Sequence, residues 1–595
     1  MVSPTNNLSA FSLSALLTDF KGVVAADHVL TKPSQQQAYV QGMIDNNYED
    51  GNGTAILPVV AVVIPQSLVE LWRVINICAK ADVIIIAQAA NTGLTGGSTP
   101  YGKYDRPVVM ISMQALTGIY LLSGGAEVVA LPAATLQELE YKLAPLGREP
   151  HSVLGSSCVG ASIIGGICNS SGGMLVQRGP AYTEMALFAR RNAEGHFELI
   201  NNLGVDLGDE PEQMLDNLQK GQFNKTLDSS KVNNNNDRKN SNRQYQTKVR
   251  DCDADTPARF NNDPSGLYEA SGSAGKLIVF AVRVATYPKT AQEQTFYIST
   301  NNADTLTKLR QGWLKSTLNL PILAEYMHKE YNDITLTYGR DTCLSMRKLS
   351  ADKIGALYRL QAKINYHLDK WHLPKTLPDR VLQLASNFMP TSLPKTLIKQ
   401  AITNQYHLII KVADDDIESA HEFLRSHLQQ HQGTLHLCTD EESQALLVFR
   451  SAATAAMFRY HNLHSKDFGA LLSTDIALPR NAVDWDEKLP AHLQKKVSKT
   501  FYLGHFFCHV MHQDYLLHAS INTDIDTKTF KDELLAFYDQ RRIEYPAEHN
   551  VGHIYTAKPE LHEFYKELDP TNSLNPGIGQ AVKGKNWRSS PNLEE

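Results

Sequence analysis

The chain has 595 residues, of which 42% are hydrophobic and 20% are charged, with a net charge of −6. Such a composition is typical of a globular protein of at least two domains, since one domain usually holds about 100–200 residues. The slightly acidic balance excludes a surface that binds nucleic acid throughout, and we expect no nucleic-acid partner.

Seven cysteines are scattered along the sequence without a CxxC pair, which indicates free thiols in a reducing compartment. No basic residue precedes Lys21, although a secretory signal begins with positive charge. No apolar run approaches the ~20 residues of a membrane span. These observations predict a soluble or peripheral protein on the cytoplasmic side.

In the first 200 residues, short apolar strands alternate with amphipathic helices, which predicts an α+β fold. Two helices are expected to begin after Ser67 and Thr135, because serine and threonine are favoured N-cap residues. The predicted strands lie at 59–65, 83–88, 107–112 and 126–134.

The pattern changes after residue 200. Residues 209–250 include an Asn-rich run with few apolar side chains, which we interpret as a mobile surface insertion. A strong strand follows at 276–287. Farther on, helices are predicted within 353–385, and strands at 406–413 and 445–450.

The segment "IIIAQAANTGLTGGSTPYG" (84–102) places a nearly bare backbone directly after a predicted buried strand. Glycines there allow main-chain N–H groups to approach a diphosphate closely. This first glycine loop lacks the GK[ST] of a P-loop and the GxGxxG spacing of a dinucleotide fingerprint. Taken alone, it is equally well explained as an ordinary turn.

A second Gly/Ser/Asn-rich segment, "LGSSCVGASIIGGICNSSGG" (154–173), favours a ligand-binding interpretation. Two such loops can clamp one long diphosphate ligand from two sides. Neither loop contains a lysine or arginine, which suits a tightly held dinucleotide cofactor better than a substrate for phosphoryl transfer.

Both loops, with "GGMLVQRGPAYTEMALFAR" after the second, resemble the PCMH-type FAD-binding domain of the vanillyl-alcohol-oxidase-like flavoproteins. With "GREPHS", "DADTPARFN", "YPAEHNVGH" and "DPTNSLNPGIG", the chain is similar to the respiratory, quinone-dependent D-lactate dehydrogenases over nearly its whole length. The resemblance implies an α+β architecture with a two-subdomain FAD-binding domain at 1–288. It also implies an inserted cap for substrate and membrane at 289–530, and a segment at 531–595 that returns to the FAD domain.

The resemblance places FAD on both glycine loops and on one strand. The implied contacts are Ala89, Ala90, Asn91, Thr92, Gly93, Gly97 and Ser98 in the first loop, Gly155, Ser162 and Gly172 in the second, and Val279. Some relatives attach FAD covalently through a histidine in the first loop. No histidine lies between 84 and 102, so we expect non-covalent FAD.

The resemblance implies oxidation of D-lactate to pyruvate by hydride transfer to FAD, which requires a base and a cation for the carboxylate. His549 is the expected base, and Arg480 is the expected carboxylate partner. A surface ion pair between Arg480 and Asp484 is the competing interpretation. Arg178 is an alternative cation, and Tyr182 is expected either to pack beside the flavin ring or to contact substrate.

Related D-2-hydroxyacid dehydrogenases carry a divalent metal on two histidines seven residues apart and a glutamate. His505, His512 and Glu548 match this pattern and are expected to hold Zn²⁺ or a similar ion. Hydrogen-bonded core histidines are the competing interpretation. The relatives' Gly-Asp-Gly-Asn turn is replaced here by "FFCHVM". Because an odd spacing on a regular strand separates side chains onto opposite faces, the metal site requires a turn or bulge there.

The resemblance further implies a quinone acceptor and peripheral attachment to the cytoplasmic face of the bacterial inner membrane. Basic and aromatic residues that would contact anionic lipid are Lys370, Trp371, Lys375, Arg380, Phe388, Lys395 and Lys399, with Lys583, Lys585 and Arg588 as a second contact. A solvated helical face is the alternative.

Three other functions stay open at the level of sequence. The chain could oxidise another small D-2-hydroxy acid, it could bind flavin without catalysis as a redox scaffold, or it could be an oxidase that uses O₂.

Overall fold

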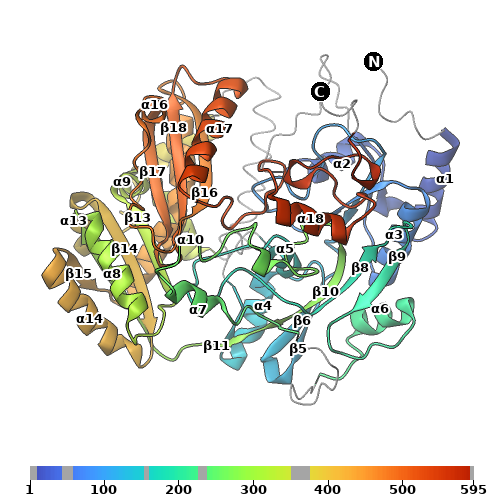
Figure 1. The fold of residues 1–595 in the computed structure, drawn as a ribbon, viewed down its shortest axis with the longest axis horizontal. Coiled ribbons are helices and arrows are strands. Elements are labelled where there is room, and N and C mark those ends of the chain that lie inside the picture. Colours follow the sequence, from blue (N-terminus) through green and yellow to red (C-terminus); the bar gives the residue numbers. More distant parts are fainter. Residues whose placement is uncertain (1–9, 43–57, 153–159, 226–237, 350–375, 590–595) are drawn as a thin grey trace.

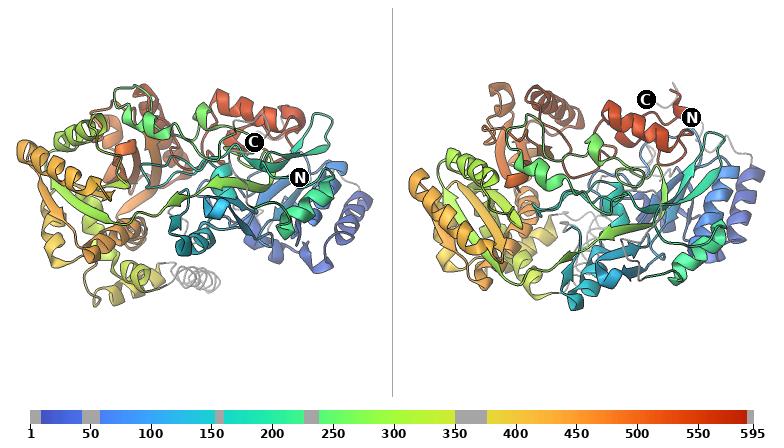
Figure 2. Two further views of the ribbon diagram at one scale, coloured as in Figure 1. Left: turned by 90° about the horizontal axis from the view of Figure 1, so that it is seen from below. Right: turned by 60° about the horizontal axis from the view of Figure 1, so that its bottom comes forward.

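The computed structural model describes residues 10–42, 58–152, 160–225, 238–349 and 376–589. Two lobes lie side by side in the three views of Figures 1 and 2. The N-terminal lobe contains sheets of four and five strands, and the inserted lobe contains one sheet of seven strands. Among the described residues, no helix combines the length and the apolar character that crossing a bilayer requires.

The four-stranded sheet of the N-terminal lobe carries the first glycine loop. Its order is β1 (Val29–Leu30), β2 (Val59–Val63), β4 (Val108–Ser112), β3 (Ile84–Gln88). The last three strands run parallel, because helix α3 (Leu68–Lys80) returns the chain between β2 and β3. Ser67 caps α3 as predicted, and the loop leaves the carboxyl end of β3.

The five-stranded sheet of this lobe supports the second glycine loop. Its strands, in sheet order, are β5 (Ile119–Leu122), β6 (Glu127–Ala130), β10 (Ile278–Ala285), β8 (Ala186–Arg191) and β9 (Phe197–Asn201). Helices α4 (Leu136–Leu143) and α5 (Ile163–Cys168) pack their apolar residues against it. Two short strands, β7 (Arg148–Glu149) and β11 (Tyr287–Pro288), pair antiparallel as a separate two-stranded sheet.

The predicted insertion at 209–250 is packed where the structure describes it. Helix α6 (Pro211–Lys220) buries Leu215 and Leu218 in the N-terminal lobe, and α7 (Tyr245–Arg250) buries Tyr245 in the core of the inserted lobe. The prediction of a mobile insertion was wrong for these two parts, because apolar residues at helical spacing outweigh the polar composition around them. Residues 226–237 lie outside the described residues.

The inserted lobe is built on an antiparallel sheet between two layers of helices. Its strands, in sheet order, are β15 (Thr434–Leu437), β12 (Glu293–Thr300), β14 (Tyr406–Ala413), β13 (Leu323–His328), β17 (Val497–His505), β18 (Val510–His518) and β16 (Phe468–Ala477). Helices α8 (Ala303–Lys315) and α14 (Asp416–His431) cover one face. The other face is covered by α9 (Lys329–Tyr338), α13 (Lys395–Thr403) and α15 (Asp440–Leu463).

One predicted strand of the inserted lobe is helical. Residues 445–450 lie inside α15, which begins at a capping box formed by Thr439 and Glu442. Ala445, Leu446 and Phe449 are buried on one side of this helix. A six-residue apolar run does not distinguish a strand from a buried helix, and here the capping residues decide.

The C-terminal part of the chain connects the lobes. Helix α17 (Asp524–Gln540) packs Phe530 and Leu534 into the core of the inserted lobe, so the return to the N-terminal lobe begins after α17 and not at 531. Helix α18 (Pro559–Leu568) then lies on the N-terminal lobe (Figure 1). Beyond it, Leu574 joins that core and bridges to Ile85 of β3.

Gly552 fixes the approach of this return segment to the first glycine loop. Its φ is +52°, and an added Cβ would lie 2.1 Å from the carbonyl oxygen of Thr95. We expect Gly552→Ala to lower the free energy of unfolding by at least about 1–2 kcal/mol, the cost of a left-handed backbone, with the clash adding to it. Denaturant midpoints measure the change. Gly266→Ala is the control, because no atom lies within 4 Å of its added Cβ, and equal losses in both variants would contradict the prediction.

Candidate active site

The segment 547–553 touches both glycine loops and the inserted sheet. The main-chain N–H of Gly172, in the second loop, donates to the carbonyl of Glu548 at 3.4 Å. The main-chain N–H of His553 donates to the carbonyl of Thr95 in the first loop at 3.0 Å. An added Cβ at Gly172 would lie 2.7 Å from the Glu548 carboxylate, so a larger residue would force the Glu548 side chain to move. The two loops therefore meet at one segment.

Two hydrogen bonds fix the shape of the first loop. Ser98 Oγ donates to Asn91 Oδ1 at 2.9 Å, and Asn91 Nδ2 donates to the carbonyl of Gln41 at 2.8 Å. No atom lies within 4 Å of a Cβ added to Gly93, and the neighbouring Ala89, Ala90 and Thr92 are half-buried. Main-chain groups of this loop are thus accessible to a ligand.

The second loop and β10 offer mainly backbone. Ser162 caps α5, where its Oγ accepts from the main-chain N–H of Gly165 at 3.0 Å. Val279 packs in the core beside a bulge in the pairing of β10 with β8, so its main chain is the part available to a ligand. Gly155 lies outside the described residues.

Asn575 links the first loop to the chain before β10, and sequence reasoning missed it. Its Nδ2 donates to the carbonyls of Gly97 at 2.8 Å and Ala274 at 2.9 Å, while its buried Oδ1 has no partner. An unpaired buried acceptor is costly unless a ligand supplies a donor. This atom and the open main chain beside Gly93 fit the hydroxyl and phosphate groups of a dinucleotide.

A cluster of charged side chains surrounds Glu548. The Oε2 atom of Glu548 lies 3.1 Å from His505 Nε2 and 3.6 Å from His512 Nε2, and its Oε1 pairs with Arg259. β17 ends at His505, and a short 3₁₀ turn leads into β18. Leu503 pairs with His512 across this hairpin, which puts both histidines on one sheet face. The turn that a shared metal requires is therefore present.

A second carboxylate and an arginine support His505 from the sheet side. Glu325 of β13 is the register partner of His505, and its Oε1 lies 2.6 Å from His505 Nδ1. Arg450 of α15 contacts Glu325 Oε2 at 3.0 Å. Burial lowers the pKa of His505, but Glu325 and Glu548 raise it to about 9. Burial also opposes ionisation of Glu548, yet Arg259 and His505 hold its pKa well below the usual range.

Asp475 of β16 orients His549. The Oδ2 atom of Asp475 lies 2.9 Å from His549 Nδ1 and accepts from the main-chain N–H groups of Glu548 and His549 at 2.7 and 3.2 Å. Burial lowers the pKa of His549, but the carboxylate of Asp475 more than offsets this and raises the pKa to about 8. Because Nδ1 faces Asp475, Nε2 is the nitrogen left for a substrate.

The side-chain donors of Arg480 bond the loop 248–256. Its Nε and Nη2 donate to the carbonyl and Oγ1 of Thr256, both at 2.9 Å, and its Nη1 donates to the carbonyl of Lys248 at 2.8 Å. These contacts stabilise the loop 248–256 and do not favour the predicted carboxylate contact of Arg480, which stays a prediction. The competing ion pair with Asp484 is wrong, since Arg480 pairs with Asp251 at 3.3 Å and Asp484 pairs with Arg541 at 2.5 Å.

The alternative substrate contacts, Arg178 and Tyr182, also bond other residues. Arg178 pairs with Glu149 and donates to the carbonyl of Pro150 at 2.8 Å. The hydroxyl of Tyr182 donates to Glu184 at 2.8 Å.

Arg259 was missed as a separate residue, although it lies in the "DADTPARFN" motif. It is 1% exposed, and its Nη2 donates to the carbonyl of Gly173 at 2.7 Å and pairs with Glu548. Its Nε and Nη1 have no partner. The side chain borders a cavity of about 20 Å³ that Tyr245 and Asn261 also line. Arg259 therefore has donors available beside the cluster.

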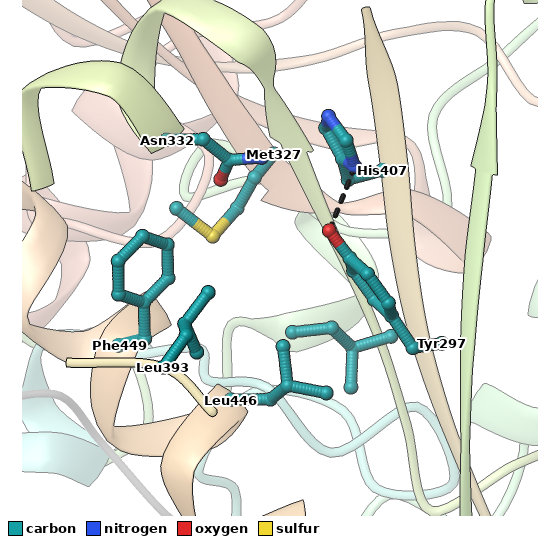
Figure 3. A pocket seen from close by; sticks show the side chains of 8 residues that line it. Tyr297, Met327, Asn332, Leu393, His407, Leu446 and Phe449 are labelled. Atoms are coloured by element: carbon teal, nitrogen blue, oxygen red, sulfur yellow. Dashed lines mark hydrogen bonds between the residues drawn. The ribbon is translucent and has the colours of Figure 1, made fainter. Parts of the chain in front are cut away.

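A second cavity lies inside the inserted lobe (Figure 3). Tyr297, Met327 and Phe449 line it, and the Tyr297 hydroxyl lies 2.8 Å from His407 Nδ1. Its volume of about 10 Å³ is roughly the space that one water molecule needs. The cavity is too small for an organic ligand.

The predicted basic patch is partly described. Arg380, Phe388, Lys395 and Lys399 are exposed, whereas Lys370, Trp371 and Lys375 lie outside the described residues. Helix α12 (Leu377–Ser386) and the turn after it also expose a stripe of apolar side chains at Leu377, Val381, Leu384 and Phe388.

In the second predicted lipid contact, two of the three basic side chains bind other residues of the chain. Lys583 donates to the carbonyl of Tyr101, and Lys585 pairs with Asp82 at 2.5 Å. Arg588 is exposed.

Comparison with known proteins gives full-length matches. A family profile described as FAD binding domain matches residues 59–183, and one described as D-lactate dehydrogenase, membrane binding, matches residues 295–587. The chain is 44% identical to the quinone-dependent D-lactate dehydrogenase of Escherichia coli (strain K12), covering 96% of this chain and 98% of that protein. It is 43% identical to the protein of the same description from Haemophilus influenzae, covering 97% and 100%.

Solved structures share the fold at low identity. The 4-ethylphenol oxidase of Gulosibacter chungangensis matches with a TM-score of 0.57 and 11% identity, covering 97% of this chain and 98% of that chain. p-Cresol methylhydroxylase matches with a TM-score of 0.57 and 13% identity at the same coverage. The comparisons confirm the predicted PCMH-type α+β fold and FAD as the cofactor.

The pair of Asp475 and His549 predicts a specific titration. In Asp475→Asn, the pKa of His549 should fall from about 8 to below 6.5, because burial persists while the negative charge is lost. NMR titration of the imidazole, assigned with His549→Gln, measures this change. Asp484→Asn removes an exposed carboxylate that pairs with Arg541 and should leave the His549 titration unchanged. An unaltered pKa in Asp475→Asn would refute the role of Asp475.

Proposed function

Because the chain belongs to the family of quinone-dependent D-lactate dehydrogenases, we propose that it oxidises D-lactate to pyruvate and passes two electrons to a membrane quinone. The observation that supports this proposal best is the placement of His549 and the Glu548 cluster on the segment that touches both glycine loops. His549 as the base and Arg259 as the carboxylate-binding arginine thus lie beside the residues that fit FAD.

The N-terminal lobe holds FAD through main-chain groups of the two glycine loops. Asn575 adds an unpaired acceptor at the first loop. No histidine is available in that loop for a covalent link, so the cofactor is bound non-covalently. When bound, FAD accepts a hydride from the substrate and later delivers the electrons to the quinone.

His549 acts as the base. With Nδ1 held by Asp475, Nε2 receives the proton of the C2 hydroxyl as the C2 hydride leaves. Asp475 stabilises the imidazolium that forms, which raises the basicity of the ring. Since a pKa of about 8 leaves His549 largely protonated at neutral pH, turnover rises as the pH approaches 8.

His505, His512 and Glu548 are the residues that would hold a divalent cation. Their ligand atoms lie within 4.8 Å of one another, and two histidines with one carboxylate suit Zn²⁺ with an open position. Glu325 would orient His505 through Nδ1, as carboxylates commonly orient metal-bound histidines. A cation there would polarise the hydroxyl of an α-hydroxy acid.

Arg259 binds the substrate carboxylate, which is the role that the sequence analysis expected of Arg480. Its unpaired Nε and Nη1 lie beside the Glu548 cluster, where a substrate carboxylate would gain charge-assisted hydrogen bonds. Arginine keeps its charge even when fully buried, so the site attracts small organic anions.

The inserted lobe carries the membrane contact at the stripe of α12. Leu377, Val381, Leu384 and Phe388 expose apolar side chains, with Arg380 between them along the chain. An apolar stripe beside basic residues suits the interface of an anionic bilayer. We assign this contact to the cytoplasmic face of the bacterial inner membrane, where D-lactate and quinone are both within reach.

The proposed reaction is tested on the purified holoenzyme without oxygen. D-Lactate should bleach the oxidised flavin absorbance, and a quinone analogue should restore it. L-Lactate, D-2-hydroxyglutarate and glycolate serve as comparison substrates. Bleaching by another hydroxy acid in preference to D-lactate would reassign the substrate, and no bleaching by any of them would support a non-catalytic scaffold. Peroxide production in air would indicate an oxidase.

Arg259 and Arg480 provide a matched pair of variants. Arg259→Lys should lower kcat/KM for D-lactate about 10- to 100-fold, because hydrogen bonds to charged groups contribute about 1.5–3 kcal/mol. Arg480→Lys should leave KM unchanged and lower thermal stability only. FAD content verifies that each variant is folded. A normal KM in Arg259→Lys, or a raised KM in Arg480→Lys, would reverse the assignment.

The membrane contact is tested by flotation with phosphatidylglycerol-containing vesicles. Val381→Asp with Phe388→Asp should reduce the bound fraction at least tenfold, since each buried side chain of this size contributes about 1.5–3 kcal/mol. Val483→Asp is the control, because Val483 is 63% exposed and lies outside α12. If both proteins float like the unmodified chain, the stripe is not the contact.

A further inference from the structure

A second group of metal-ligating side chains lies at the edge of the inserted sheet, away from the Glu548 cluster. It comprises His436 at the end of β15, Cys438 directly after that strand, and Glu442 in the first turn of α15. β15 and β17 are separated in the sheet by β12, β14 and β13. With about 4.8 Å between neighbouring strands, the group lies on the order of 19 Å from His505.

The local fold brings the three ligand atoms together. His436 and Cys438 are two residues apart on an extended segment, so their side chains share a face, and α15 covers that face. The capping box of α15 turns Glu442 back towards the strand. Glu442 Oε2 lies 2.9 Å from His436 Nε2, and all three ligand atoms lie within 4.8 Å of one another.

We propose that His436, Cys438 and Glu442 form a binding site for Zn²⁺ or a similar borderline-soft divalent cation, distinct from the site that oxidises D-lactate. One nitrogen, one sulfur and one oxygen ligand with a water in the fourth position match the preferences of zinc. The donor atoms of a tetrahedral zinc lie about 3.3–3.6 Å apart, given bond lengths of about 2.0–2.3 Å. Shifts of about 1 Å would therefore complete the site.

The electrostatics of the group also favour a cation. The main-chain N–H of Thr439 donates to Glu442 Oε2 at 3.1 Å, which holds the carboxylate beside His436 and Cys438. A bound divalent cation would compensate the carboxylate and stabilise the thiolate, with release of the thiol proton to solvent.

Such an ion would join the edge strand β15 to α15. The same helix carries Arg450, which contacts Glu325 and through it His505. Thr396 of α13 donates to Glu442 Oε1 at 2.6 Å, so a third element is tied to the group. The cation would thus stabilise the helical layer that supports the active-site side of the sheet.

Zinc K-edge X-ray absorption of the holoenzyme, loaded with one equivalent of Zn²⁺ in the His512→Gln background, tests the proposal. Flavin is silent in this measurement, and His512→Gln removes a ligand of the other candidate site. We expect a Zn–S distance of about 2.3 Å. The Zn–S signal should vanish in the added Cys438→Ser variant, and bound zinc should fall at least tenfold in both Cys438→Ser and His436→Gln.

Two results would overturn the assignment. Zinc bound by nitrogen and oxygen alone would indicate adventitious binding to other histidines, of which the chain has 21 in all. A Zn–S signal that persists in Cys438→Ser would place the ion on another cysteine. Because His436→Gln keeps the thiol and removes one ligand, it separates loss of a ligand from an effect of the cysteine substitution on folding.

Discussion

The buried carboxylate of Glu548 is the constraint on which the site depends. This group is 7% exposed, and a charge so far from water is tolerable only when paired and hydrogen-bonded. Arg259 and His505 supply the opposite charge, and the Glu548 main chain contacts Gly172. Satisfying one carboxylate thus brings the second glycine loop, the β17–β18 hairpin and the return segment to a single point.

The two lobes contribute different groups to the site. The N-terminal lobe provides open main chain at Gly93 and an unpaired acceptor at Asn575, which suit a cofactor held without cationic side chains. The inserted sheet provides Asp475, His505 and His512, which surround Glu548 and His549 of the return segment. Asp475 lies opposite His512 in the sheet, so the residue that orients His549 is a strand neighbour of a candidate metal ligand.

Sequence reasoning predicted those parts of the site that reside in contiguous motifs. The glycine loops, His549 and the group of His505, His512 and Glu548 each lie in a short string with recognisable chemistry, and the structure brings the last three together. Glu325, Arg450 and Asp475 are single charged residues far apart in the sequence; strand register places Glu325 and Asp475 in the cluster, and the packing of α15 places Arg450 there. The contacts of Arg480 could not be predicted, because a sequence shows where an arginine lies but not which carbonyls occupy its donors. The strand expected at 445–450 was wrong, since capping residues outside the apolar run determined the helix.

Anaerobic rapid mixing of D-lactate with the Glu548→Gln holoenzyme tests most directly whether Glu548 organises the site. Removing the charge leaves Arg259 and His505 uncompensated and weakens the alignment of substrate against flavin, while the glycine loops keep their own hydrogen bonds. We predict that the variant retains FAD and that flavin bleaching slows by about 10- to 100-fold, the range for loss of an orienting partner. Bleaching at the rate of the unmodified enzyme would contradict the central role of Glu548.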